Sequence, residues 1–351
     1  MIGRLVSKSL GLALVGAALS LTLAACGGSD EKKAEGGSDK IVFSILTTEN
    51  SQNQRELWAP FLADMEAQTG LDIEPFFGSN YASLVEAMRF NQVQVGWFSN
   101  ASGLEAVRRA QGEVFMRSSD PSGVDGYKSL IIVPASSRTT LDDVLKCDRT
   151  LTFGMGDAKS TSGTLAPMTY LFGPRGIDPA RCFSAVRSAN HEANLLAVAN
   201  NQVSAATNNS TMLRLRQETN PDLIAKVRVI WESPMIPEDP LVWRKDLDPS
   251  AKEKLRSFFL TYGTAEGPEG ERQREILRKL SWGTFRAADD SHLLAVREME
   301  ATEKLIEARN GGAAAAIAEA QRGLDAIRAE RARVEAATPA QAPADPVPAQ
   351  K

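Results

Sequence analysis

The sequence predicts an α/β protein with two lobes and a cleft between them, followed by helices at the C-terminal end. Short apolar runs alternate with segments of helical spacing through most of the chain, and this alternation is typical of βαβ units that build a mostly parallel sheet. Pro234, Pro237 and Pro240 interrupt the pattern and indicate a crossover that returns to the first lobe. The length of 351 residues is enough for two domains of ordinary size.

The first lobe is predicted to begin with the segment 40–134. The apolar run 41–46 favours a buried strand, because a strand in a parallel sheet is covered on both faces. Apolar residues over 55–69 recur at the spacing of one helical face, and Gly70 follows as a stop. The further strands expected here are 73–77, 93–97 and 127–133, and the further helices are 82–90 and 104–110.

The second lobe is predicted over 135–239. Its expected strands are 151–154, 183–188, 203–207 and 227–231, and its expected helices follow Ser160 and begin at His191. The chain would cross between the lobes twice, near 134–138 and near 233–241, and two such segments form a hinge beside a cleft. Open α/β sheets bind ligands at the carboxyl ends of their strands. A binding protein that closes about a hinge is therefore the expected class.

The chain then rejoins the first lobe, which is expected to take in 240–337, and is mostly helical. Helices are expected over 250–263, 273–280, 292–309 and 313–337. Apolar residues recur at heptad-like spacing in the last of these at Ile317, Leu324, Ile327 and Val334. The last two helices form either a hairpin against the body or a weak homodimer interface. The tail 338–351 carries four prolines and is predicted to be disordered.

The composition excludes several functional classes. Hydrophobic residues make up 43% of the chain and charged residues 24%, which is the balance of a folded protein. Lys and Arg number 40 against 44 Asp and Glu, so the net charge is −4, whereas nucleic-acid-binding proteins usually carry a basic surface. Two histidines and three cysteines leave little material for a zinc site. We therefore expect no nucleic-acid partner, no metal and no cofactor.

The N-terminal segment 1–25 predicts a lipoprotein signal peptide. Arg4 and Lys8 precede 16 uncharged residues, 10–25. A helix of that length spans about 24 Å, less than the roughly 30 Å of a hydrocarbon core, and so it is typical of a cleaved signal and not of a membrane-spanning helix. The run ends with Leu-Ala-Ala before Cys26, which looks like a bacterial lipobox with a lipidated cysteine. The alternative is an ordinary signal peptide with an incidental cysteine.

The residues that follow predict a tether. The segment 26–39 is rich in Gly, Ser and mixed charges without a large apolar residue, which is the composition of a flexible linker. We expect a body outside the cytoplasm, anchored by lipid to the bacterial cell membrane, on the periplasmic side if the envelope has two membranes.

Two cysteines remain in the body. Cys147 and Cys182 each precede a strand-like stretch, and parallel neighbouring strands would bring both sulfurs to one end of a sheet. In an oxidising compartment a disulfide is then expected. Two buried free thiols are the alternative.

Hydroxyl groups gather at the junction between a predicted strand and helix. Ser160, Thr161 and Ser162 are good N-cap residues. The N-terminus of a helix offers free N–H groups and a partial positive charge, so it attracts oxyanions. The three hydroxyls therefore indicate an oxyanion site, although capping alone would need only one. The stretch is not a Walker loop, because the required Gly-Lys-Ser/Thr is absent from the sequence here.

Three further side chains occupy similar positions. His191 and Tyr81 each follow a predicted strand and precede a helix, and Tyr127 lies near the first crossing. A phenol is a neutral donor that suits a phosphoryl oxygen. A single histidine is more often structural, so by itself His191 leaves both roles open.

Several motifs of four or more residues occur in one order over roughly 40–300. They are 48–52 (TENSQ), 58–62 (WAPFL), 88–91 (MRFN), 151–163, 191–194 (HEAN), 196–200, 206–209 (ATNN), and Trp231 through 243–245 (WRK). In these motifs the chain resembles the phosphonate-binding proteins of bacterial phosphonate ABC transporters. The resemblance implies the type II periplasmic-binding-protein fold: two α/β lobes joined by a two-stranded hinge, here with additional C-terminal helices.

The resemblance also implies a function and a site. The ligand would be a phosphonate, captured between the lobes without catalysis and delivered to an ABC permease driven by its ATPase. The phosphonate head group would be held by Tyr81, Tyr127, Ser160, Thr161, Ser162 and His191. Hydroxyl, imidazole and backbone N–H groups would then donate to the three phosphonate oxygens.

The organic end of the ligand is implied by two further positions. In relatives that bind 2-aminoethylphosphonate, two carboxylates receive the ligand ammonium. One of these positions is Asp239 in this chain, and the other is Thr211, which has no carboxylate. Lys128 is a second residue that differs from the family pattern, because this position is often aromatic in the family. Because a buried ammonium with one carboxylate is costly, the sequence predicts a phosphonate or related oxyanion whose tail need not be aminoethyl. A turn-capping role for Asp239 between prolines is the alternative.

Rival functions remain at this point. A binding protein of the same fold for phosphite, phosphate or sulfonate would use the same hydroxyls. An exported phosphoesterase would need an activated nucleophile or a metal cluster, and Ser160 with His191 is the one candidate pair. A structural lipoprotein would depend on the C-terminal helices instead.

Overall fold

The computed structural model describes residues 40–337. The predictions of a signal peptide over 1–25, of lipidation at Cys26, of a linker over 26–39 and of a disordered tail over 338–351 lie outside the described residues. Within 40–337, no helix combines the length and the apolar composition that crossing a membrane would require.

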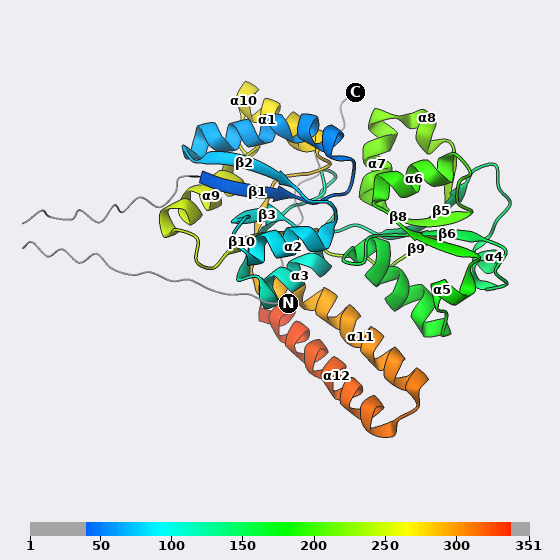
Figure 1. Ribbon diagram of the computed structural model, residues 1–351. Helices are drawn as coiled ribbons and strands as arrows, with labels where there is room; N and C mark the ends of the chain where they lie inside the picture. Colours follow the sequence, from blue (N-terminus) through cyan, green and yellow to red (C-terminus); the bar gives the residue numbers. More distant parts are fainter. Residues whose placement is uncertain (1–39, 338–351) are drawn as a thin grey trace, which may run out of the picture. The chain divides into compact units, whose positions relative to one another are not determined.

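The first sheet has six strands in the order β11-β4-β10-β3-β1-β2 (Figure 1). Its strands are β1 (Lys40–Ile45), β2 (Asp72–Phe77), β3 (Val95–Trp97), β4 (Gly112–Arg117), β10 (Pro240–Arg244) and β11 (Arg286–Ala287). Strand β1 pairs in parallel with β2 and β3, whereas β10 lies antiparallel between β3 and β4. The accompanying helices are α1 (Ser51–Thr69), α2 (Tyr81–Arg89), α3 (Asn100–Arg109), α9 (Pro249–Thr261) and α10 (Gly267–Lys279).

Helix α1 shows how local sequence sets the ends of these elements. The Asn50 side chain caps its N-terminus by accepting a hydrogen bond from the Asn53 amide at 3.0 Å. Gly70 ends it with a φ of 65°, a left-handed conformation that glycine adopts without strain. The buried face of α1, with Trp58 and Phe61, packs against the aromatic core beneath the first sheet.

The second sheet has five strands in the order β7-β6-β8-β5-β9. Its strands are β5 (Ser129–Pro134), β6 (Thr152–Met155), β7 (Ala185–Ser188), β8 (Ala205–Asn209) and β9 (Val227–Glu232). Strands β6, β7 and β8 are parallel, and β5 runs antiparallel between β8 and β9. Its helical segments are α4 (Leu141–Leu145), η1 (Thr161–Leu165), η2 (Met168–Phe172), η3 (Gly173–Arg175), α5 (Pro179–Cys182), α6 (His191–Ala199), α7 (Ser210–Thr219) and α8 (Pro221–Ile224).

The predicted boundary between the lobes at 134 is wrong. Strand β5 was expected in the first lobe, but it pairs with β8 and β9 in the second sheet. All six of its residues are buried, and such a strand looks the same from sequence whichever sheet receives it. The first crossing therefore lies over 118–128, before β5.

The second crossing lies where it was predicted, between β9 and β10, and it pairs with the first. Tyr127 and Ile236 form an antiparallel bridge, with N–O distances of 2.8 and 2.7 Å in the two directions. The two connecting segments therefore lie side by side and form the two-stranded hinge that the fold class implies.

The C-terminal helices form a hairpin. A short turn η4 (Asp290–Leu293) leads into α11 (Leu294–Gly311) and α12 (Ala314–Ala337), which are drawn in orange and red in Figure 1. Leu324 is buried against Ala301 and Leu305, and Ile317 and Ile327 pack beside it. The apolar seam of α12 thus packs against α11 within the hairpin, which agrees with the first of the two expectations. The homodimer remains a prediction.

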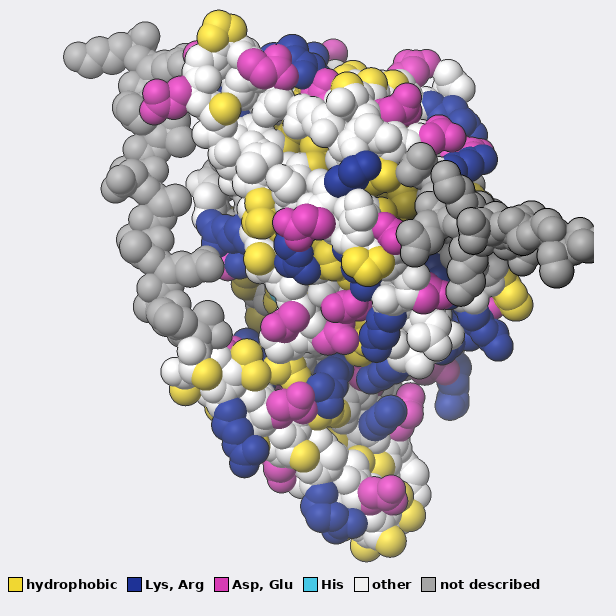
Figure 2. Space-filling view, turned by 90° about the vertical axis from the view of Figure 1, so that its left-hand side faces the viewer, with side chains coloured by type: hydrophobic (Ala, Val, Ile, Leu, Met, Phe, Trp, Pro, Cys, Tyr) yellow, Lys and Arg dark blue, Asp and Glu magenta, His cyan; other side chains and the backbone are white. Residues whose placement is uncertain are grey.

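The hairpin surface is charged, and α11 contacts both lobes. Figure 2 shows Lys and Arg mixed with Asp and Glu down to the lower end of the molecule, where the hairpin lies. In the first lobe, Arg108 forms an ion pair with Glu300 at 2.7 Å. In the second lobe, the Thr169 hydroxyl donates to the Met299 carbonyl at 3.5 Å.

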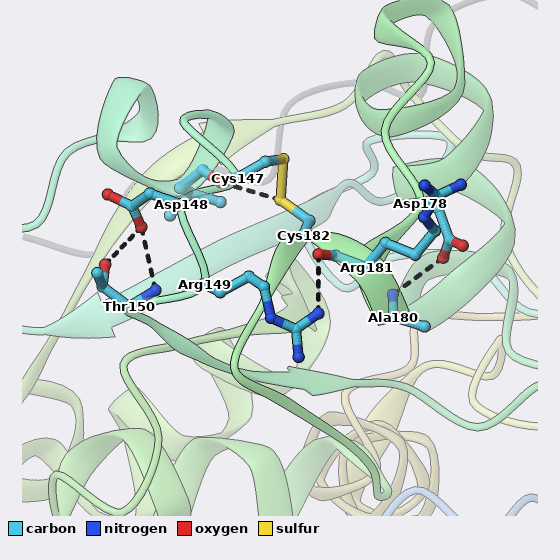
Figure 3. Close-up of a disulfide and its surroundings, with 9 residues drawn as sticks. Cys147, Asp148, Arg149, Thr150, Asp178, Ala180, Arg181 and Cys182 are labelled. Carbon is cyan, nitrogen blue, oxygen red and sulfur yellow. Dashed lines mark hydrogen bonds between the residues drawn. A yellow bond between two sulfur atoms is a disulfide. The ribbon is translucent and has the colours of Figure 1, made fainter.

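Cys147 and Cys182 are joined by a disulfide (Figure 3). They precede β6 and β7, which are parallel neighbours, so both sulfurs lie at the same end of the second sheet. The bond connects positions 35 residues apart. The Arg149 amide and guanidinium donate to the carbonyls of Cys182 and Arg181, both at 3.2 Å, which fixes the chain beside it.

Replacing both cysteines with serine is expected to lower the free energy of unfolding by about 3–4 kcal/mol. A cross-link across a loop of this length removes conformational entropy from the unfolded chain. Urea unfolding of the purified variant, followed by circular dichroism, measures the change, and the wild type with and without a reducing agent is the control. An unchanged unfolding midpoint would show that the disulfide contributes nothing.

Candidate functional site

A cavity lies between the two sheets, at the carboxyl ends of their parallel strands. Each of β1, β2, β3, β6, β7 and β8 leads into residues that line it, which is the expected place for a ligand in open α/β sheets. Its volume of about 60 Å³ leaves room for only a few water-sized groups. We call this cavity the cleft. The predicted residues that line it are Tyr81, Tyr127, Ser160, Ser162, His191, Thr211 and Asp239.

Ser160 lies between β6 and η1, and Ser162 lies within η1, where the backbone makes a close turn. Ser160 caps the helical segment η1 and accepts from the Gly163 amide at 2.9 Å. The Gly156 amide donates to the Gly163 carbonyl at 2.9 Å, and a Cβ on Gly156 would lie 2.4 Å from the Gly163 Cα. Glycine is therefore required there, because the two backbones touch. This contact holds the hydroxyls of Ser160 and Ser162 at the wall of the cleft.

His191 lies beside these hydroxyls as the first residue of α6. Its Nε2 is 3.4 Å from the Ser160 Oγ and 3.3 Å from the Ser162 Oγ. Burial lowers the pKa of His191 to about 4, so the imidazole is neutral at physiological pH. A neutral imidazole offers one donor and one acceptor nitrogen. Its Nδ1 has no hydrogen-bond partner among residues 40–337.

The two predicted tyrosines supply buried hydroxyl donors. Tyr81 is 1% exposed and Tyr127 is 5% exposed, and burial raises the pKa of both phenols well above the usual value. Both therefore stay protonated. The Tyr127 hydroxyl donates to the Asp239 Oδ1 at 3.0 Å.

Two adjacent carboxyl groups, Glu238 and Asp239, line the cleft. The Asp239 Oδ1 accepts from the Asn100 amide and side chain at 3.2 and 3.1 Å, in addition to Tyr127. Burial raises the pKa of Asp239 to about 7 and that of Glu238 to about 8, where the charge of Asp239 adds to the effect. The Glu238 Oε1 is buried without a hydrogen-bond partner in the described chain.

Thr161 is placed apart from its predicted companions. Its side chain is fully buried, and its Oγ1 accepts from the Ala101 amide of α3 at 2.9 Å. It is not among the residues that line the cleft. The predicted hydroxyl row thus divides: Ser160 and Ser162 face the cavity, and Thr161 joins the two lobes.

The sequence missed several residues of the cleft. Ser99 follows β3 and caps α3, accepting from the Ser102 amide at 3.1 Å; this strand, hydroxyl and helix order is the same signal that singled out Ser160. Asn209 ends β8, and its Nδ2 donates to the Ser162 Oγ at 3.3 Å. Glu238 has no local signal beyond its acidic neighbour.

A buried charge network joins the lobes above the cleft. Arg216 of α7 pairs with Glu49 at 2.6 Å and with Glu192 at 2.9 Å. Glu192 also accepts from the amide and side chain of Asn50 and from the side chain of Asn53, at 2.8, 2.9 and 2.9 Å. The two lobes are therefore in contact, which corresponds to a closed arrangement.

The donors that line the cleft are neutral hydroxyl, imidazole and amide groups, which can form hydrogen bonds to an anion. Within 40–337, no three His, Cys, Asp or Glu residues are grouped as a metal ion would require. Ser160 and His191 lack, in this part of the chain, the acidic partner that orients the histidine of a hydrolytic triad.

Comparisons with known proteins agree on one family. Residues 43–293 match the model of the periplasmic substrate-binding proteins of phosphonate ABC transporters. The phosphonates-binding periplasmic protein of Escherichia coli is 42% identical over 76% of this chain and 77% of its own length. A phosphate-import protein of Mycolicibacterium smegmatis is 25% identical over 79% of this chain and 91% of its own.

A solved structure agrees as well. The binding protein component of an ABC phosphonate transporter from Pseudomonas aeruginosa is 40% identical, with a TM-score of 0.77 over 85% of this chain and 97% of that one. The shared fold, the matched length and the cleft at the strand ends lead to one conclusion: the chain belongs to the family of periplasmic substrate-binding proteins of phosphonate ABC transporters.

Proposed function

We propose that this chain captures a small phosphonate in the cleft and delivers it to the permease of an ABC importer, whose ATPase drives transport. The observation that carries the proposal is the convergence of Ser160, Ser162 and His191, with Nε2 to Oγ distances of 3.3 to 3.4 Å, on one wall of a buried cavity. The head-group set is proposed to be Tyr81, Tyr127, Ser160, Ser162 and His191, without Thr161, whose side chain does not line the cleft. In this role the chain is not an enzyme.

The energetics of this site suit reversible capture. A hydrogen bond to a charged acceptor contributes about 1.5–3 kcal/mol. Four or five such bonds reach micromolar affinity, about −8 kcal/mol, after the costs of closure and ordering are subtracted. The small volume of the cleft, about 60 Å³, favours a ligand with a short organic tail.

Isothermal titration calorimetry tests the proposal. Methylphosphonate is expected to bind the wild type with micromolar affinity, and Ser162→Ala is expected to weaken it about 10-fold, because one charge-assisted donor is lost. Ser257→Ala is the matched control, since Ser257 is exposed on α9. Absence of heat with every phosphonate tried would refute the proposal.

Phosphate or phosphite uptake is the second candidate. All three hydrogen bonds of Asp239 from the described residues end on Oδ1, so Oδ2 can accept from the P–OH group of a protonated oxyanion. The named role of the M. smegmatis relative in phosphate import points the same way. Phosphate or phosphite binding tighter than methylphosphonate in the same titrations would favour this function.

The location and assembly of the chain are also proposals. We infer that Cys26 carries a lipid that anchors the chain to the cell membrane, outside the cytoplasm. Cys26→Ser is expected to move the protein from the membrane fraction to the soluble fraction after cell lysis. A homodimer through the C-terminal helices would use surfaces other than the α12 seam, which packs on α11; sedimentation velocity would detect it.

A further inference from the structure

The first turn of α2 contains a hydrogen-bond donor that the local sequence does not satisfy. Asn80 and Ser83 form a capping box, in which the Asn80 Oδ1 accepts from the Ser83 amide at 2.8 Å. Such a box leaves the amide of Tyr81, the first helical residue, without a partner in the helix. The segment 81–84 contains no acidic residue, so the partial positive charge at this helix end receives no counter-charge from its own turn.

Asp157 of the second lobe supplies the missing partner. Its Oδ2 accepts from the Tyr81 amide at 3.1 Å, and a carboxylate is favoured at the N-terminus of a helix. Its Oδ1 accepts from the Lys159 amide at 2.8 Å, and its carbonyl accepts from the Ser160 amide at 2.9 Å and the Thr164 hydroxyl at 2.8 Å. The carboxylate is therefore fixed to the turn that carries Ser160 while it bonds to the first lobe.

One turn of the second lobe thus holds Tyr81 at two points. The amide of Tyr81 donates to Asp157, and its phenol interacts with the Ser160 side chain. The Lys159 carbonyl in the same turn accepts from the Ser99 hydroxyl, at the N-terminus of α3, at 2.7 Å. Each of these contacts joins residues of different lobes, so separation of the lobes breaks them.

We propose that Asp157 is a positioning residue for ligand capture: its carboxylate caps α2 of the opposite lobe, fixes Tyr81 at the cleft and holds the lobes closed over the ligand. Asp157 is not among the residues that line the cleft, so it acts through Tyr81. The inference rests on the proposed function and adds to it a residue that controls ligand release. Because the open arrangement lacks this bond, its loss raises the rate of release and leaves the rate of capture nearly unchanged.

Stopped-flow fluorescence with methylphosphonate separates these two rates, because Trp58, Trp97 and Trp282 line the cleft and report its occupation. Asp157→Ala is expected to raise the dissociation rate constant about 10-fold, since a hydrogen bond to a charged acceptor is lost. The association rate constant is expected to stay within about threefold of the wild-type value. Asp157→Asn keeps an oxygen acceptor, and its dissociation rate constant is expected to rise about threefold.

Asp148→Ala is the matched control. The Asp148 Oδ1 accepts from the Thr150 amide at 3.0 Å (Figure 3), just as the Asp157 Oδ1 accepts from the amide two residues further along the chain. Both alanine variants therefore lose the same kind of local turn bond, and Asp157→Ala also loses a bond between the lobes. Both rate constants of Asp148→Ala are expected to lie within about twofold of the wild-type values.

The outcomes separate the inference from the function on which it rests. An unchanged dissociation rate constant in Asp157→Ala, an effect confined to association, or an equal rise in Asp148→Ala would overturn the inference while leaving phosphonate binding in place. If circular dichroism shows that Asp157→Ala is unfolded, Asp157→Asn carries the test, and release at the wild-type rate would overturn the inference. Failure of the wild type to bind methylphosphonate would overturn the proposed function, and the inference with it.

Discussion

Replacing His191 with leucine is expected to lower phosphonate affinity about 100-fold. The imidazole lies within 3.4 Å of two hydroxyl groups, so its loss removes one hydrogen bond to the ligand and leaves Ser160 and Ser162 without the group that orients them. A charge-assisted bond accounts for about 1.5–3 kcal/mol of this effect, which is roughly 10- to 150-fold. Calorimetry with methylphosphonate gives the affinity of each variant.

His191→Gln is the control for this experiment. Its side-chain amide retains a donor and an acceptor near the position of Nε2, and its affinity is expected to lie between those of the wild type and His191→Leu. Circular dichroism shows whether each variant is folded. Equal binding by the leucine variant and the wild type would place the head group away from α6.

Replacing Arg216 with methionine is expected to weaken binding at least 100-fold by a different route. In the closed arrangement Glu49 and Glu192 would lose their cation while remaining buried, since their side chains are 4% and 12% exposed. Removing one partner of a buried ion pair costs about 3–5 kcal/mol. The open arrangement hydrates the same carboxylates, so the cost falls on closure and thereby on ligand affinity.

Arg278→Met is the matched control, because Arg278 of α10 pairs across the lobes with Glu218 of α7 at 2.9 Å. This pair is exposed, with side chains 50% and 41% accessible, and an exposed pair contributes about 1 kcal/mol or less. Calorimetry is expected to show a change of less than fivefold for Arg278→Met. Small-angle scattering measures closure directly, and a ligand-bound Arg216→Met as compact as the wild type with unchanged affinity would rule out the network.

Much of the fold could be predicted from the chain because its signals are local. The strand and helix of 41–69 follow from an apolar run, a helical face and Gly70, and the structure places them within a few residues of the expected bounds. Strand pairing is not local. Strand β5 carries the same apolar pattern in either sheet, and its antiparallel partners β8 and β9 come later in the chain.

The site divides in the same way. Ser160, His191 and Tyr81 follow strands and begin helices, and parallel strands bring such positions to one edge. Thr161 belongs to the same row of hydroxyl residues as Ser160, but its side chain contacts α3. Only the arrangement of the two lobes determines that contact. Glu238 escaped notice for a similar reason, because its burial depends on segments far away in the sequence.

The position of β10 bears on the order in which the molecule can assemble. The last strand of the second sheet, β9, ends at residue 232. Strand β10, which lies between β3 and β4 in the first sheet, ends at residue 244. During synthesis, the second lobe can therefore form all of its strand pairs while the first lobe still lacks strand β10. The first lobe is thus the later to be completed, because its strand β10 pairs with β3 and β4 only after the whole second sheet has been synthesised.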